Sequence, residues 1–399
     1  MHRVTTVPPS LSAPVRWFRE FGRPPRILGL DVARGLAILG MAGAHIGETS
    51  TFDWLDPATW TDLVHGRSSI LFAVLAGVSI ALMTGRSALP DPARLPGIRL
   101  GLIGRGAVIF LIGLALEFLN TPIAVILTLY GLLYVAVIPF LRWKPWQLLL
   151  GAGVLALAGP ALLALLGAVT LNPFGAGIGF VLYGSYPITV WMAFVLGGMA
   201  LGRLHVATVR TAVIALVTGV VLAIVGYGLG AAGSDVVRGF ESGSSFEEPP
   251  ASGWPGYADA LAQADPLGAL LHAIFAVEPH SGGTAEILGS GGFALAVVAL
   301  CLLLSRPLRW PLLPIGALGS MPLSAYSGHV LAIALITGPG GYYTSNVFWA
   351  VLAIGMLLVT TAWSIFVGRG PLERLVGFAA RRMAEVPARP DITRPRLDA

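Results

Sequence analysis

Three ionisable side chains lie within one apolar stretch near the N-terminus, residues 27–46. They are Asp31, Arg34 and His45. A charged side chain at the centre of a membrane span costs about 2.5–3.5 kcal/mol on insertion scales, so such residues usually serve a function. Arg34 and His45 are eleven residues apart, which places them on one helical face about 16 Å apart along the axis. Asp31 precedes Arg34 by three residues, a spacing at which an ion pair forms on a helix.

The two ends of this stripe suit different chemistry. The imidazole of His45 could take a proton from a hydroxyl or amine, or it could be a structural histidine bonded to a neighbouring helix. The guanidinium of Arg34 matches phosphate or carboxylate, or it could form a purely structural ion pair with Asp31. Arg105, in a later apolar run, adds a second positive charge on the side of Arg34. The spacing alone leaves both alternatives open.

A second group of candidates lies near the opposite membrane surface. His65 and Arg67 open the second apolar run, where the alternative role is a helix cap and anchor. His280 stands at the entrance of another run, where an ordinary loop histidine is the alternative. His329, with Tyr326 one turn earlier, lies deep in an apolar run and needs a partner there. These residues could line the side from which an acceptor enters.

The composition predicts a membrane protein. Hydrophobic residues make up 55% of the chain and charged residues 11%, with a mean hydropathy of +0.79. A soluble fold could not hide this much apolar surface, so we expect a polytopic α-helical membrane protein. The net charge of +5 does not indicate a nucleic-acid partner, because the basic residues lie at the ends of apolar runs. The single Cys301 and the scattered histidines give no metal-ligand spacing, so no metal is expected.

The apolar runs predict an all-α bundle of about ten membrane-spanning helices. The predicted spans are 27–46, 68–85, 98–119, 121–141, 147–167, 187–202, 211–230, 284–304, 314–337 and 346–367. Most of the basic residues fall in alternate connecting segments, which the positive-inside rule assigns to the cytoplasm together with both termini.

The same pattern predicts the domain organisation. Residues 1–25 form a cytoplasmic leader without the apolar core of a signal peptide, and residues 371–399 form a cytoplasmic tail. The transmembrane domain covers 26–370 and contains a long, acidic extracytoplasmic loop at 231–283. Within that loop, the apolar segment 265–277 is too short to span and is expected to form an interfacial or re-entrant helix.

Five segments resemble the membrane-bound acyltransferases. They are RILGLDVARGLAILGMAGAH from residue 26, HGRSSILFAVLAGVSIAL from 65, GSYPITVWMAFVLGGMALGR from 184, GSMPLSAYSGH from 319 and GRGPLERL from 368. Arg34 and His45 match the arrangement of an arginine and a histidine eleven residues apart in the acyltransferase 3 family. The closer resemblance is to bacterial YeiB-like proteins and the related heparan-α-glucosaminide N-acetyltransferase catalytic domain. It extends over nearly the whole chain.

The resemblance implies transfer of an acyl group, most often acetyl, across the membrane. The donor would be cytoplasmic acetyl-CoA or another acyl-CoA, and the acceptor an extracytoplasmic glycan or lipid-linked sugar. Carried over by position, Arg34 would contact the CoA, with Asp31 and Arg105 beside it. His45 would stand near the reacting centre.

The identity of the catalytic base stays open between two histidines. The related lysosomal enzymes place a catalytic histidine in the loop after the first span, and an ungapped comparison puts Asp56 at that position. His65 is the nearest imidazole, nine residues further on. Three alternatives therefore stay open: the catalytic base is His45, it is His65, or it is neither of them.

Two other classes compete with the acyltransferase hypothesis. A secondary transporter or exporter of a small anion or lipid would bind its substrate at Arg34 and carry protons on Asp31 or His45. A non-catalytic scaffold fits less well, because it gives no reason for a charged stripe inside a span. The excess of arginine over lysine and the lack of an organelle signal favour a bacterial plasma membrane. A homodimer is compatible with the sequence.

Overall fold

The computed structural model describes residues 12–48, 50, 52–53, 55–170, 187–243 and 253–385. This part of the chain contains helices and no strand, which confirms the all-α prediction. Four predicted features lie partly outside the described residues. The parts not described are 1–11 of the leader, 184–186 of the segment GSYPITVWMAFVLGGMALGR, 244–252 of the long loop and 386–399 of the tail.

The helices follow the predicted apolar runs closely. They are α1 (Ala13–Glu20), α2 (Leu28–Ile46), α3 (Arg67–Met83), α4 (Leu95–Glu117), α5 (Leu127–Ala136), α6 (Pro145–Thr170), α8 (Ile188–Arg203), α9 (Val209–Ala232), α10 (Ser234–Gly243), α11 (Gly253–Gln263), α12 (Pro266–Phe275), α13 (Thr284–Leu304), α14 (Arg309–Gly319), α15 (Pro322–Thr337), α16 (Asn346–Phe366) and α17 (Pro371–Ala384). Short 3₁₀ helices are η1 (Pro57–Leu63), η2 (Pro92–Arg94) and η3 (Ile138–Phe140).

Eight of the ten predicted spans each overlap one helix, whereas 121–141 contains the shorter α5 and η3, and 314–337 is divided between α14 and α15. Fewer helices are long and apolar enough to cross a membrane unaided. Within the described residues, five meet that test by length and composition: η2 with α4, and α6, α9, α13 and α16. The pair α14 and α15, bent by 73°, makes a sixth if it is one span. Helices α3, α5 and α8 are shorter than the roughly 20 residues that a span usually needs. The count of ten therefore stays a prediction.

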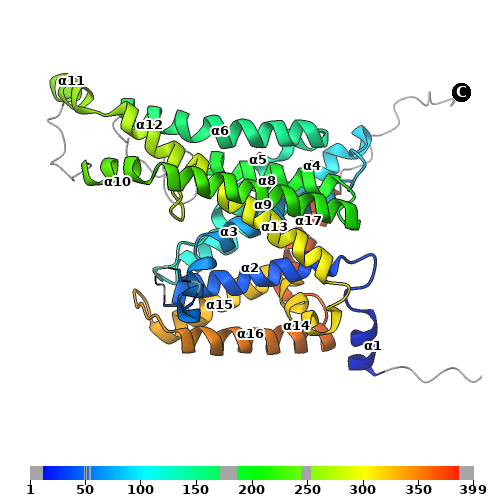
Figure 1. Ribbon diagram of the computed structural model, residues 1–399. Coiled ribbons are helices and arrows are strands. Elements are labelled where there is room, and N and C mark those ends of the chain that lie inside the picture. Colours follow the sequence, from blue (N-terminus) through cyan, green and yellow to red (C-terminus); the bar gives the residue numbers. More distant parts are fainter. Residues whose placement is uncertain are drawn as a thin grey trace, which may run out of the picture.

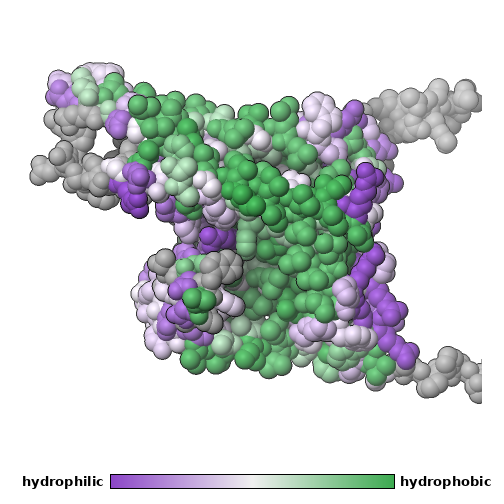
Figure 2. Space-filling model, in the orientation of Figure 1, coloured by the Kyte–Doolittle hydropathy of each residue, from purple (hydrophilic) through white to green (hydrophobic). Residues whose placement is uncertain are grey.

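The helices form a bundle with two polar ends. In Figure 1, α6, α8 and α9 lie along one side, α14, α15 and α16 along the other, and α2, α3 and α13 between them. Figure 2 shows apolar residues across the middle of this face and hydrophilic residues gathered at its two ends. Such a belt is what a membrane-embedded surface requires. The chain is therefore a membrane protein.

The ends of two helices are packed directly on α2. Helix α14 ends at Gly319, where an added Cβ atom would lie 1.8 Å from the carbonyl oxygen of Asp31. Only glycine permits this approach of two backbones. Pro322 then opens α15 at a position where its missing N–H costs nothing. The predicted continuous span 314–337 is thus broken at the level of Asp31.

Candidate functional site

Two cavities lie on either side of the start of α5. The first, here called the histidine cavity, is lined by His45, His65 and His280 and has a volume of about 220 Å³. The second, here called the arginine cavity, is lined by Arg34 and Arg105 and measures about 120 Å³. Helix α2 contributes to both, with His45 to one and Arg34 to the other. The two ionisable residues predicted to share one face of this helix therefore lie at two separate cavities.

His45, which lines the histidine cavity, is paired with a second histidine that is not part of the lining. His45 Nδ1 lies 3.2 Å from Nε2 of His329, and the two rings stack with their centroids 5.3 Å apart. His329 is fully buried, and Tyr326 packs edge-on against its ring at 4.9 Å. Because His45 lines the cavity and its Nδ1 faces His329, Nε2 is the nitrogen left for a ligand. The sequence named each of these residues but not their contact.

His280 reaches the histidine cavity from the loop between α12 and α13. Its backbone has a φ of +69°, a conformation that residues other than glycine rarely adopt. Burial and the nearby His65 lower the pKa of His280 to about 4, so its imidazole is neutral at pH 7.

The loop that carries His280 is held by Glu286, in the first turn of α13. Its carboxylate is 4% exposed and accepts hydrogen bonds from the N–H of His280 at 2.8 Å and of Gly282 at 2.7 Å. It also accepts one from the hydroxyl of Ser281 at 3.1 Å. Sequence reasoning missed Glu286, although an acidic residue inside the predicted span 284–304 was a visible signal.

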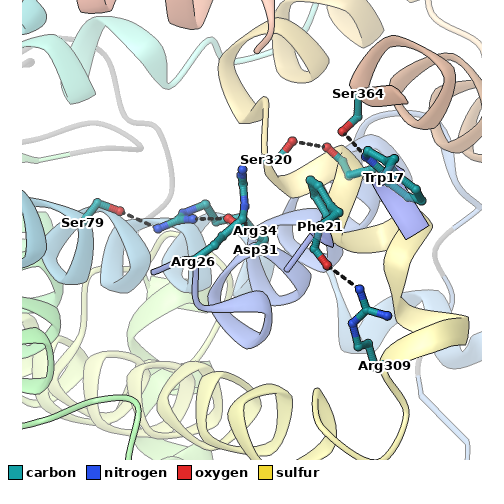
Figure 3. A network of polar contacts seen from close by, with 10 residues as sticks. Trp17, Phe21, Arg26, Asp31, Arg34, Ser79, Arg309, Ser320 and Ser364 are labelled. Atoms are coloured by element: carbon teal, nitrogen blue, oxygen red, sulfur yellow. Dashed lines mark hydrogen bonds and ion pairs between the residues drawn. The ribbon is translucent and has the colours of Figure 1, made fainter. Parts of the chain in front are cut away.

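Arg34 is held in a fixed orientation at the arginine cavity. It donates to Oδ1 of Asp31 at 2.8 Å and to Oγ of Ser79 at 2.9 Å. Asp31 is 4% exposed and also accepts from Arg26, so one buried carboxylate binds two guanidinium groups. Figure 3 shows this chain of contacts running from Arg26 through Asp31 and Arg34 to Ser79. The predicted ion pair is present, and it presents Arg34 to the cavity.

The same end of the bundle carries the N-terminal helix. Arg309 donates to the carbonyl oxygen of Phe21 at 2.8 Å, and Nε1 of Trp17 donates to Oγ of Ser364 at 2.8 Å (Figure 3). The Arg26 guanidinium lies over the Phe21 ring at 4.9 Å. These contacts fix α1 to α14 and α16 beside the Asp31 network.

Arg105 connects the arginine cavity to a wider groove. The groove lies between η2, α4 and α17, includes Arg94 and has a volume of about 530 Å³. Arg105 lines both spaces, and its guanidinium lies 5.9 Å from the centre of the Tyr134 ring. Glu373 of α17 also lines the arginine cavity, where it accepts from the N–H groups of Leu323 and Ser324 at the start of α15.

Only a thin partition separates the two cavities. Tyr130, which lines the arginine cavity, donates from its hydroxyl to the carbonyl oxygen of Ser69 at 3.4 Å. Ser69 lines the histidine cavity. One turn away, the N–H of Ile126 donates to the Tyr326 hydroxyl at 3.4 Å. Both contacts are long for hydrogen bonds, so they are weak.

Four predicted site residues lie outside both cavity linings: Asp31 and His329, which contact Arg34 and His45, and also Arg67 and Asp56. Arg67 donates to the Tyr227 hydroxyl at 2.6 Å and to the Asp62 carbonyl at 2.8 Å, and Tyr227 in turn contacts Ser290 at 3.1 Å. Asp56 is exposed beside η1. These positions give neither Arg67 nor Asp56 a contact with the space around His45.

The fold and the cavities together define a class: a helical membrane protein in which two cavities, each lined by ionisable side chains, lie on either side of a partition. Residues 26–227 match the family model described as heparan-alpha-glucosaminide N-acetyltransferase, catalytic. The match covers just over half of the chain and includes Arg34, His45, His65 and Arg105. The chain therefore belongs to this family, as the resemblance predicted. No curated protein matches the chain. The YeiB-like branch stays a resemblance.

Proposed function

We propose that the protein is a transmembrane acyltransferase that moves an acetyl group from acetyl-CoA on the cytoplasmic side to an extracytoplasmic glycan or lipid-linked acceptor. The observation that carries the proposal is the pair of cavities joined by α2, with Arg34 in one and His45 in the other. Family membership supports the acetyl-transfer chemistry. The positive-inside pattern supports an orientation in which the Arg34 end faces the cytoplasm, with both termini there.

The donor would bind from the arginine end. The wider groove with Arg94 and Arg105 suits the phosphates of a CoA nucleotide, because guanidinium groups bind phosphate through paired hydrogen bonds. The arginine cavity is much narrower and suits the slender chain that carries the thioester. Arg34, held by Asp31 and Ser79, would orient that chain toward the partition.

The reaction would occur at His45. The acceptor heteroatom attacks the thioester carbonyl carbon while Nε2 of His45 takes its proton. As the C–S bond breaks, that proton passes to the departing thiolate, which leaves as CoA–SH. His329 would orient His45 by accepting its Nδ1–H, since this tautomer leaves the lone pair of Nε2 for the substrate.

The proposal is tested with the purified full-length protein in detergent. Acetyl-CoA binding is measured by calorimetry, and CoA release is measured in the presence of candidate acceptors. We expect Arg34→Ala to lose donor binding, and His45→Ala to keep donor binding but lose turnover. His205→Gln is the matched histidine control, because His205 is exposed and outside both cavities. Turnover by His45→Ala at the wild-type rate would refute the role of His45.

The break between α14 and α15 favours a second candidate, a secondary transporter. Discontinuous helices in transporters place helix ends at a substrate site, and this break lies beside Asp31. In that case Arg34 would bind a small anion. Uptake of an anion into proteoliposomes without any acyl donor, abolished by Arg34→Ala, would support transport over transfer.

A further inference from the structure

The described lining of the histidine cavity holds no carboxylate, guanidinium or ammonium group. Its polar groups are the imidazoles of His45, His65 and His280 and the hydroxyls of two serines and two tyrosines. The other described lining residues are apolar, and none is Asp, Glu, Lys or Arg. This contrasts with the arginine cavity, which holds two guanidinium groups and a carboxylate.

The buried carboxylate that holds the His280 loop does not supply a charge to the cavity. Glu286 is turned toward the loop backbone, where His280, Ser281 and Gly282 take up both of its oxygens. It is not part of the cavity lining. The low pKa of His280 agrees with an environment that does not favour a cation.

A charged acceptor would therefore bind poorly in this cavity. An ammonium group needs a carboxylate or several strong acceptors when it leaves water, and an anion needs a guanidinium or ammonium partner. A hydroxyl has neither requirement. It can donate to one imidazole and accept from another group. One nitrogen available for such a bond is Nδ1 of His65, which is buried and has no hydrogen-bond partner among the described residues.

The size of the cavity also restricts the acceptor. A volume of about 220 Å³ is below the roughly 300–1,000 Å³ of most sites for drug-sized ligands. Only the end of an acceptor, about one sugar ring, can enter. Tyr326 and Tyr342 provide aromatic surface against which the apolar faces of a sugar can pack.

We propose that the acceptor group in the histidine cavity is a neutral sugar hydroxyl, so that the protein forms an ester rather than an amide. This inference rests on the proposed acyltransferase function. The hydroxyl oxygen forms the new C–O bond with the thioester carbon, and the C–S bond breaks. The hydroxyl proton goes to His45 and then to the CoA thiolate, so the products are the acetyl ester and CoA–SH.

The test uses purified full-length protein, acetyl-CoA labelled in the acetyl group, and three matched acceptors. These are methyl glucoside, which is neutral, methyl glucosaminide, which carries an ammonium, and methyl glucuronide, which carries a carboxylate. Products are treated with mild base, which cleaves acetyl esters and leaves acetyl amides intact. We expect base-labile label on methyl glucoside at a rate about tenfold or more above either charged sugar. His45→Ala should abolish this label, and His205→Gln should retain it.

The outcomes separate this inference from the function on which it rests. Base-stable label on methyl glucosaminide, at a rate above that of methyl glucoside, would overturn the inference and support acetyl transfer itself. Intact acetyl-CoA binding without any transfer to methyl glucoside would also overturn the inference. If the folded wild-type protein does not bind acetyl-CoA, the proposed function itself is overturned, and this inference with it.

Discussion

Glu286 offers a sharp test of how the histidine cavity is built. Its carboxylate accepts two backbone N–H groups and one hydroxyl from the turn that carries His280. His280 itself has a φ of +69°, which costs a residue other than glycine about 1–3 kcal/mol. The turn therefore keeps this shape only while Glu286 holds it. Replacing Glu286 with alanine should release the turn and withdraw His280 from the cavity.

The magnitude follows from the hydrogen bonds that are lost. Each buried donor left without an acceptor costs about 1–3 kcal/mol. Relaxation of the turn exposes these donors to water and relieves the strain at His280. We therefore assign each of the two N–H groups a cost of about 1 kcal/mol, the lower end of this range. Glu286→Ala should then destabilise the protein by about 2 kcal/mol. Glu286→Gln keeps one acceptor oxygen and should lie between alanine and wild type.

Two measurements distinguish positioning from general damage. The thermal unfolding midpoint in detergent should fall in Glu286→Ala, and the KM for the acceptor should rise. The Kd for acetyl-CoA should stay unchanged, because the arginine cavity lies across the partition. Glu278→Gln, at an exposed glutamate of the same loop, is the matched control. Wild-type melting and wild-type acceptor KM in Glu286→Ala would refute the reasoning.

Three further predictions follow from the same geometry. Because the folded pKa of His280 is about 4 and the unfolded value near 6.5, the folded state binds fewer protons between these values. Stability should fall by up to about 3 kcal/mol as pH drops through this window, and His280→Gln should remove that loss in a melting series. Arg34→Lys, which cannot keep paired bonds to both Asp31 and Ser79, should weaken acetyl-CoA binding about tenfold by calorimetry, and unchanged binding would argue against a donor clamp. Tyr130→Phe removes a long hydrogen bond, worth at most about 1 kcal/mol, from the partition and should raise acetyl-CoA hydrolysis without acceptor by up to about fivefold, whereas an unchanged rate would show that the partition does not limit access.

Much of the fold follows from hydropathy alone. The predicted span 284–304 coincides with α13, and 346–367 with α16 to within one residue. The broken pair α14 and α15 was missed, because hydropathy averaged over 314–337 passes across the turn before Pro322. The bend depends on the close packing of Gly319 on Asp31, which are 288 positions apart. No local pattern contains that contact.

The candidate site was predictable only where it lies on one helix. Helical spacing placed Arg34 and His45 on a common stripe, and the structure puts each at a cavity. The contact between His45 and His329 could not be derived from spacing, because the two residues are 284 positions apart. The same holds for Ser79 beside Arg34 and for Glu373 at the start of α15. Such partners are set by how the helices pack.

Under the proposed function, the position of Arg34 and His45 on one helix constrains how transfer would occur. Arg34 is fixed by Asp31 and Ser79, and the backbone of α2 is fixed by its contact with Gly319. The distance between Arg34 and His45 is therefore constant, so under the proposed function α2 would not itself carry the acetyl group across. The part that would have to move is the partition, where the contacts of Tyr130 with Ser69 and of Ile126 with Tyr326 are long hydrogen bonds. Under the proposed function, a thioester arriving from the arginine cavity would part these two contacts with part of its binding energy, whereas water without a donor has no comparable binding energy to do so.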